Sequence, residues 1–194
     1  MKSNEDTIAL FGTSADPPTC GHQSLLEGLL TLFPKVITWA SDNPMKQHGA
    51  SLAKRQDLLK ALVKAIKNPN LELLPEISSP WTIKTLELAN ARWPSAELVF
   101  VIGSDLASQI PTWSNAKDVL KKARLGIAPR DGWPLQPTAI KKLESLGGRI
   151  ELLPLKIPAS ASSEVRTNPE IKQIPAAVLP MLLKHHLYGF TKGN

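Results

Sequence analysis

The sequence has few of the residues on which several specialised protein classes depend. Cys20 is the single cysteine among 194 residues, which excludes an internal disulfide and a cysteine-based zinc site. No apolar run approaches the roughly 20 residues of a membrane span. The polar N-terminus, MKSNEDT, also lacks the apolar core of an export signal. These absences predict a cytoplasmic protein that does not contact a membrane.

Aromatic residues are scarce as well, at 5% of the chain, and they do not alternate with basic residues. A formal net charge of +6 suggests an anionic partner, which could be nucleic acid, an acidic surface or a small phosphorylated ligand. A platform for single-stranded nucleic acid needs aromatic side chains among its basic ones, so we expect no nucleic-acid partner. The basic stretch KRQDLLKALVKAIK is typical of a solvated helix face.

Short apolar runs typical of buried strands alternate along the chain with patterns typical of amphipathic helices. Strands are predicted for residues 7–12, 35–40, 71–75, 96–103, 124–129 and 149–155. Helices are predicted for residues 22–33, 51–67, 82–93, 104–110, 114–123, 137–146 and 175–190. This alternation predicts an α/β fold with a Rossmann-like, doubly wound parallel sheet and helices on both faces. We expect one domain, 1–194, whose C-terminal part, 156–194, is mostly helical.

In doubly wound sheets, ligands bind beyond the carboxyl ends of the strands, so the residues that follow each strand are the candidates. The loop after the first strand has no G-x-x-x-x-G-K-S/T phosphate loop and no G-x-G-x-x-G fingerprint. Its glycines would still permit a close approach to a ligand and a turn into a helix, and the helix opening favours a phosphate. The candidates in this loop are Gly12, Thr13, Ser14, Asp16, Thr19, Gly21 and His22.

Polar residues follow the later strands too. Lys46 comes after the second strand, and Ser162 and Ser163 are candidate N-caps of a helix after the last strand. The other candidates at these strand ends are Gly103, Asp105, Arg130 and Arg166. Together they would form an electropositive rim suited to a polyphosphate, whose transfer depends mainly on alignment and charge stabilisation. Two alternatives stay open: Asp16 could cap its loop, and Arg130 could form a surface salt bridge.

Six stretches resemble, in order, the motifs of bacterial nicotinate mononucleotide adenylyltransferases of the (H/T)-x-G-H nucleotidyltransferase superfamily. GTSADPPTCGH is similar to G-G-x-F-D-P-x-H-x-G-H, NPMK to the P-x-K loop, and WTIKTLELA to the Y-T-x-x-T-L segment. VFVIGSDLASQIPTW resembles the G-x-D strand end with its L-x-x-W continuation, and SSEVR resembles I-S-S-T-x-I-R. LPMLLKHHLY resembles the closing L-P-x-x-V-x-x-Y-I-x-x-x-x-L-Y segment.

The resemblance implies transfer of AMP from ATP to nicotinate mononucleotide, with Mg²⁺ on the ATP phosphates, in the biosynthesis of NAD. By carry-over, His22 would donate to the α-phosphate, and Thr19 would bind a phosphate oxygen. Ser162, Ser163 and Arg166 would hold the β- and γ-phosphates, and Lys46 would clamp a phosphate. The remaining carried-over roles are ribose contact by Asp105 and a nicotinate pocket formed by Thr82, Thr85 and Trp113, although Trp113 could instead only pack.

Departures from these motifs keep other hypotheses open. Thr19 replaces a histidine, as in the pantetheine-phosphate adenylyltransferase branch, so the acceptor could be phosphopantetheine or nicotinamide mononucleotide. Thr13 and Ala15 stand where glycine and phenylalanine are usual, and Ser160 where isoleucine is usual. A catalytically silent nucleotide-binding protein is therefore a further alternative. Assembly into a homo-oligomer is left open by the sequence.

Overall fold

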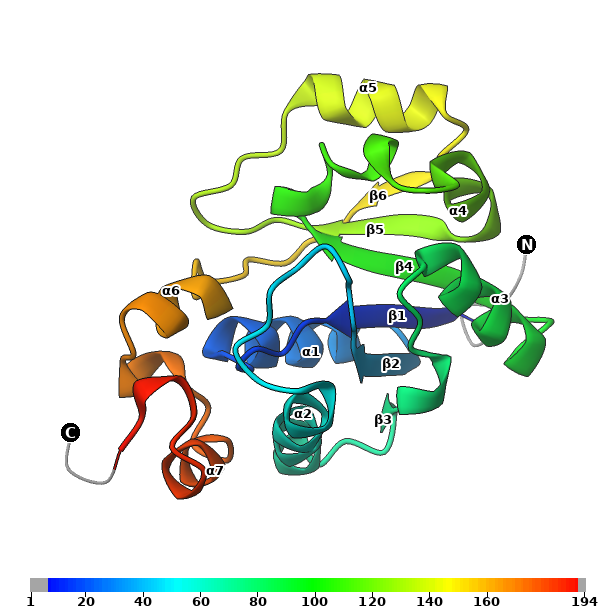
Figure 1. Cartoon of the computed structure of the whole chain (residues 1–194). Helices are drawn as coiled ribbons and strands as arrows, with labels where there is room; N and C mark the ends of the chain where they lie inside the picture. Colours follow the sequence, from blue (N-terminus) through cyan, green and yellow to red (C-terminus); the bar gives the residue numbers. More distant parts are fainter. Residues whose placement is uncertain (1–6, 192–194) are drawn as a thin grey trace.

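Six parallel strands form one sheet in the computed structural model, which describes residues 7–191 (Figure 1). The strands are β1 (Thr7–Thr13), β2 (Lys35–Ala40), β3 (Leu71–Leu73), β4 (Glu97–Gly103), β5 (Arg124–Ala128) and β6 (Ile150–Leu152). Their order is β3-β2-β1-β4-β5-β6, and each neighbouring pair is parallel. The chain moves outward from β1 to β3 and then returns to place β4 beside β1. The switch point of the sheet therefore lies between β1 and β4.

Helices connect the strands and continue the chain after the sheet. The α-helices are α1 (Cys20–Leu32), α2 (Leu52–Ile66), α3 (Thr82–Arg92), α4 (Ala116–Lys122), α5 (Pro137–Ser145), α6 (Ser162–Thr167) and α7 (Leu179–Lys184). Short 3-10 helices are η2 (Pro75–Ile77), η3 (Ser104–Leu106), η4 (Ile110–Thr112), η5 (Ile171–Gln173) and η6 (Leu187–Gly189). The described part of the segment after β6 thus contains only short helices and loops.

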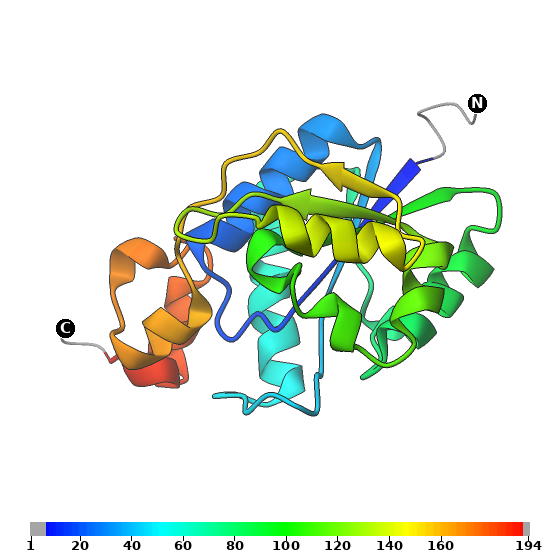
Figure 2. The same ribbon diagram turned by 90° about the horizontal axis from the view of Figure 1, so that it is seen from above.

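The sheet is covered on both faces because successive strand residues point to opposite sides. In β1, Ala9 and Phe11 pack with α1, α2 and the C-terminal helices, whereas Ile8 and Leu10 pack with α3, α4 and α5. Figure 2 shows α1 and α5 on opposite sides of the sheet. The predicted Rossmann-like fold with helices on both faces is therefore confirmed.

Several predicted element boundaries were wrong. Residues 104–110 form no α-helix but parts of η3 and η4, and the single helix predicted for 175–190 is reduced to α7 and η6. A continuous α-helix over 175–190 is interrupted because His186 and Tyr188 adopt left-handed conformations, with φ of 49° and 53°. β3 stops before Pro75, which opens η2, and β6 ends before Pro154, whose missing N–H cannot continue a ladder.

No helix among residues 7–191 is both long enough and apolar enough to cross a membrane. The expectation that the N-terminus carries no export signal falls mainly on residues 1–6, which lie outside the described residues.

Candidate active site

A cleft of about 970 Å³ opens at the carboxyl ends of β1 and β4. The loop between β2 and α2, drawn in cyan, arches over this end of the sheet in Figure 1. The predicted site residues that line the cleft are Gly12, Thr13, Ser14, Asp16, Gly21, His22, Lys46, Thr82, Thr85, Gly103, Asp105, Trp113, Arg130, Ser162, Ser163 and Arg166. The structure therefore brings together residues that are as far apart in the sequence as Gly12 and Arg166.

Thr19 is the exception, because it is fully buried and does not line the cleft. Its hydroxyl lies 2.9 Å from His22 Nδ1 and 3.0 Å from the carbonyl oxygen of Ser160. The sequence predicted that the Thr19 hydroxyl would face the same anion as His22. Instead, helix α1 starts at Cys20, so that Thr19 is its N-cap and contacts Nδ1 at the edge of the His22 ring.

The backbone of α1 fixes which nitrogen of His22 carries the proton. The N–H of Thr19 donates to Nδ1 of His22 over 3.1 Å. A neutral imidazole that accepts at Nδ1 must carry its hydrogen on Nε2. The pKa of His22 is lowered from 6.5 to about 4, mainly because the imidazole is removed from water and also because of the nearby positive charge of Arg130. At neutral pH, His22 is thus an uncharged hydrogen-bond donor in the cleft.

This lowered pKa predicts a pH-dependent stability. Between pH 6.5 and 4 the unfolded chain protonates His22 while the folded protein does not, so the free energy of unfolding falls as the pH falls. We expect wild type to lose about 2 kcal/mol more than His22→Gln between pH 7.5 and 4.5 in urea unfolding. Carboxylates titrate in both proteins and cancel in the difference. Equal losses in the two proteins would contradict the neutral state of His22.

Two glycines of the cleft are required by packing. A Cβ on Gly12 would lie 2.5 Å from the Trp39 indole, so this glycine accommodates a buried tryptophan in addition to lining the cleft. A Cβ on Gly21 would lie 3.0 Å from the carbonyl oxygen of Ser160. Gly21 thus lets the first turn of α1 approach the segment that leads into α6. This close approach brings His22 of α1 and Arg166 of α6 to one cleft.

Asp105 and Arg130 face each other where β4 and β5 end. Arg130 Nη1 lies 3.3 Å from Asp105 Oδ2, and both side chains are mostly buried. The Ser104 hydroxyl accepts from the Arg130 N–H over 3.1 Å and donates to the Trp133 carbonyl over 2.7 Å. The salt-bridge alternative for Arg130 is therefore present, within the cleft lining and not on an open surface.

The carboxylate of Asp16 is fully occupied by protein groups. It accepts hydrogen bonds from the N–H groups of Gly49 (2.8 Å) and Ala50 (3.2 Å) and from the hydroxyl of Tyr188 (2.6 Å). Arg166 Nη1 lies 3.4 Å from it and donates to the Asp16 carbonyl oxygen over 2.7 Å. This arrangement favours the loop-organising alternative for Asp16 over direct ligand contact.

Helix α6 carries the second group of phosphate candidates to the cleft. The prediction that Ser162 or Ser163 is the N-cap of this helix was wrong, because the N-cap is Ala161. Ser162 instead donates its hydroxyl to the carbonyl oxygen of Pro17 over 2.8 Å. Ser163 is exposed, and about a third of the Arg166 side chain is exposed. Lys46 lies exposed on the loop before α2. These cationic and hydroxyl groups remain accessible to an anionic ligand.

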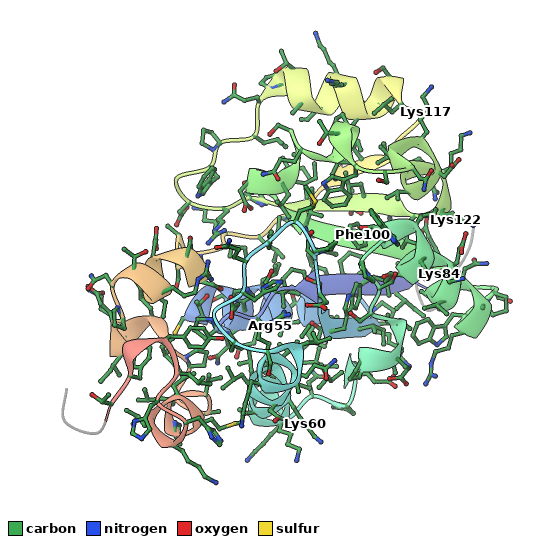
Figure 3. The ribbon with its side chains drawn as sticks, viewed as in Figure 1. Arg55, Lys60, Lys84, Phe100, Lys117 and Lys122 are labelled. Carbon is green, nitrogen blue, oxygen red and sulfur yellow. The ribbon has the colours of Figure 1, made fainter. Side chains whose placement is uncertain are left out.

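An aromatic wall forms the opposite part of the cleft. Trp113 meets Phe100, labelled on β4 in Figure 3, edge to face with ring centroids 6.3 Å apart. Thr85 is buried beside this wall, and Trp81 is more than half exposed at its mouth. These side chains give the cleft an aromatic, partly apolar surface, which is the type of surface that binds flat rings.

Several residues that organise the site were missed in the sequence. Arg55 is fully buried and ties together the loops on both sides of the cleft, and Tyr188 reaches Asp16 from the C-terminal segment. His48 and Ser160 line the cleft, each with a buried polar atom that has no hydrogen-bond partner among the described residues. Tyr188 closes the LPMLLKHHLY segment and Ser160 precedes SSEVR, but neither motif assigned these two residues a role in the site. Arg55 and His48 lie outside the quoted motifs, and their roles depend on tertiary contacts.

The described residues contain no group of three or more histidine, cysteine, aspartate or glutamate side chains that could hold a metal ion. The carboxylates of the cleft are those of Asp16 and Asp105, and both are paired with protein groups.

A cleft at the switch point of a doubly wound sheet, lined by a neutral histidine, arginines, a lysine and hydroxyls, defines a nucleotidyltransferase of Rossmann-like architecture. Residues 10–168 match the family model described as cytidylyltransferase-like. The chain belongs to this family and, within it, to the nicotinate-nucleotide adenylyltransferases, as the curated relatives show.

One such relative, from Synechocystis sp., is named a probable nicotinate-nucleotide adenylyltransferase. It is 38% identical over 156 residues, which cover 75% of this chain and 78% of the relative. A second protein of that name, from Methylibium petroleiphilum, is 26% identical over 99% of this chain and 97% of its own length. Among solved structures, the nicotinic acid mononucleotide adenylyltransferase of Plasmodium falciparum complexed with NaAD superimposes with a TM-score of 0.78. It is 20% identical, covering 96% of this chain and 98% of that one.

Proposed function

We propose that the protein transfers AMP from ATP to nicotinate mononucleotide, releasing pyrophosphate and forming deamido-NAD in the biosynthesis of NAD. The observation that carries this proposal is that His22 and Arg166 line one cleft together with the aromatic wall at Trp113. The names of the relatives and the membership of the family point to the same reaction.

The reaction needs alignment and charge stabilisation more than proton transfer. An oxygen of the acceptor's 5′-phosphate, already ionised, attacks the α-phosphorus of ATP, and the bond from that phosphorus to the pyrophosphate oxygen breaks. His22, through its Nε2–H, would donate to the α-phosphate as charge develops there. Arg166, Ser162 and Ser163 would bind the β- and γ-phosphates, and Lys46 would bind a phosphate from the opposite loop.

Binding of the remaining ligand groups follows from the cleft walls. We propose that the Asp105–Arg130 pair contacts the nucleotide and that Trp113, Thr82 and Thr85 form the pocket for the pyridine ring. The two carboxylates of the cleft are paired with protein groups and do not form a binding site for Mg²⁺. Mg²⁺ would therefore enter bound to ATP, where it reduces the negative charge of the phosphates. A cytoplasmic location and the oligomeric state remain predictions.

In the sequence, the replacement of a histidine by Thr19 is the feature that suggests phosphopantetheine as an acceptor. The buried position of Thr19 removes this direct motivation, because the residue does not meet the ligand space. The aromatic residues Trp113 and Phe100 in the cleft favour a pyridine mononucleotide as the acceptor.

The proposal is tested with a panel of acceptors. Pyrophosphate release is measured with ATP, Mg²⁺ and either nicotinate mononucleotide, nicotinamide mononucleotide or phosphopantetheine. We expect the highest kcat/KM with nicotinate mononucleotide. Preference for another acceptor would overturn the substrate assignment, and tight ATP binding without turnover on any acceptor would identify a silent nucleotide-binding protein.

A further inference from the structure

Asp16 connects three segments that are far apart in the sequence. Its buried carboxylate binds the backbone of Gly49 and Ala50, which ends the loop that carries Lys46. It also pairs with Arg166 of α6 and receives the hydroxyl of Tyr188 from η6. The Asp16 carboxylate thereby holds Arg166 directly, and it holds the loop that carries Lys46 through the backbone of Gly49 and Ala50.

The Tyr188 side chain is held firmly in this arrangement. A Cβ added at Gly49 would lie 2.9 Å from the Tyr188 ring, so the ring packs closely against the loop as well as against the carboxylate. Burial and the bond to Asp16 raise the pKa of Tyr188 well above its ordinary value. The hydroxyl therefore stays protonated and remains a donor to Asp16.

The charge of Asp16 is divided among its partners. Tyr188 and Ala50 donate to Oδ1, whereas Gly49 donates to Oδ2, which lies 3.4 Å from Arg166 and 3.6 Å from His48. Without the Tyr188 hydroxyl, Oδ1 of the fully buried Asp16 would lose its shortest hydrogen bond. A buried carboxylate cannot tolerate such a loss without reorganisation. The groups that would respond are the Arg166 guanidinium and the 48–50 backbone.

We propose that Tyr188 is a positioning residue for nucleotide binding, acting through Asp16 on Arg166 and on the loop that carries Lys46. The inference rests on the proposed function in that it takes these two cations as phosphate ligands. It assigns a role in the site to η6, whose Tyr188 contacts both Asp16 and the loop at Gly49.

The test measures the Kd for ATP by titration calorimetry, so it does not depend on turnover. Tyr188→Phe removes only the hydroxyl, and we expect ATP to bind about fivefold more weakly. Phe190→Leu is the matched control, because Phe190 is a buried core residue of the same segment and is not among the partners of Asp16. It should lower the melting temperature yet leave the Kd unchanged. Equal Kd values for Tyr188→Phe and wild type, or equal weakening by both variants, would overturn the proposal.

A double-mutant cycle separates positioning from simple destabilisation. In an Arg166→Lys background, the effect of Tyr188→Phe on the Kd should shrink, because the guanidinium group that Tyr188 positions through Asp16 is already absent. Strict additivity would contradict an action through Arg166. If wild type binds ATP but no acceptor yields pyrophosphate, the proposed function fails while the cycle still decides this inference. If wild type does not bind ATP, both fail.

Discussion

Replacing His22 by alanine is expected to lower kcat about a thousandfold, because one hydrogen-bond donor to developing charge contributes on this order. The effect on folding should be much smaller. The N–H of Thr19 would lose its acceptor, Nδ1, which costs about 1 kcal/mol. Steady-state kinetics of pyrophosphate release and urea unfolding at pH 7.5 check the two expectations separately. A severe loss of stability with kcat retained would indicate a histidine that only packs.

Glutamine and asparagine distinguish the two nitrogens of His22. The amide nitrogen of glutamine can occupy the position of Nε2, whereas asparagine reaches only as far as Nδ1, which faces Thr19. Activity should therefore fall in the order wild type, His22→Gln, then His22→Asn and His22→Ala together. Comparable kcat values for the asparagine and glutamine variants would argue against donation from Nε2.

The pH profile provides an independent check on the charge of His22. With a pKa of about 4, the imidazole stays neutral throughout the physiological range. A neutral donor predicts that kcat is flat between pH 7 and 9. If an imidazolium were required, kcat would decline about tenfold for each pH unit above its pKa. The choice of this window also avoids titration of the ligand phosphates, whose second pKa lies near 6.

The fold was largely predictable because each strand carries its own local pattern. The run of valine, isoleucine and phenylalanine in β4 indicates a strand buried on both faces, and the glycine at its end marks the exit to the cleft. All the residues that the carboxyl-end rule selected, except Thr19, line the cleft. The rule was wrong for Thr19, whose side chain is buried in the interior and does not line the cleft. The exact residue at which α1 starts decides which way this side chain faces.

The remaining parts of the site depend on tertiary contacts that no local pattern encodes. Asp16 could be placed in the loop from the sequence, but its partners Gly49, Arg166 and Tyr188 come from three other segments. The helical pattern of residues 175–190 predicted one helix, yet the chain turns away after α7 and Tyr188 bonds to Asp16. Tertiary contacts decide the path of this segment in place of helix propensity.

Arg55 shows the same limit, because in the sequence it belongs to a basic amphipathic helix. In the structure it is fully buried, and Figure 3 shows it where α2 meets the centre of the molecule, whereas Lys60 points outward. Its guanidinium donates to the carbonyl oxygens of Ser14 (2.8 Å), Ser41 (2.6 Å) and Ala50 (3.2 Å). A further bond of 2.8 Å reaches Asp42, whose side chain is 54% exposed.

Arg55→Met is expected to lower the free energy of unfolding by about 3–5 kcal/mol, because it leaves three partly buried carbonyl groups without their donor. That is a large part of the roughly 5–15 kcal/mol that stabilises an ordinary domain. Urea unfolding measures the loss. Lys60→Met is the matched control on the same helix; it is exposed and should stay within about 0.5 kcal/mol of wild type.

Arg55→Lys tests how the planar guanidinium contributes to the site. An ammonium group keeps the charge but cannot present the fork of donors that reaches both loops. The folded variant should hold the loop that carries Lys46 less firmly, so KM for both substrates should rise several-fold at temperatures well below melting. Unchanged KM values would mean that the loop is positioned by Asp16 alone. Arg55 donates to the carbonyl oxygen of Ala50, and Asp16 accepts from the N–H groups of Gly49 and Ala50, so a cation and an anion anchor the Lys46 loop at one point.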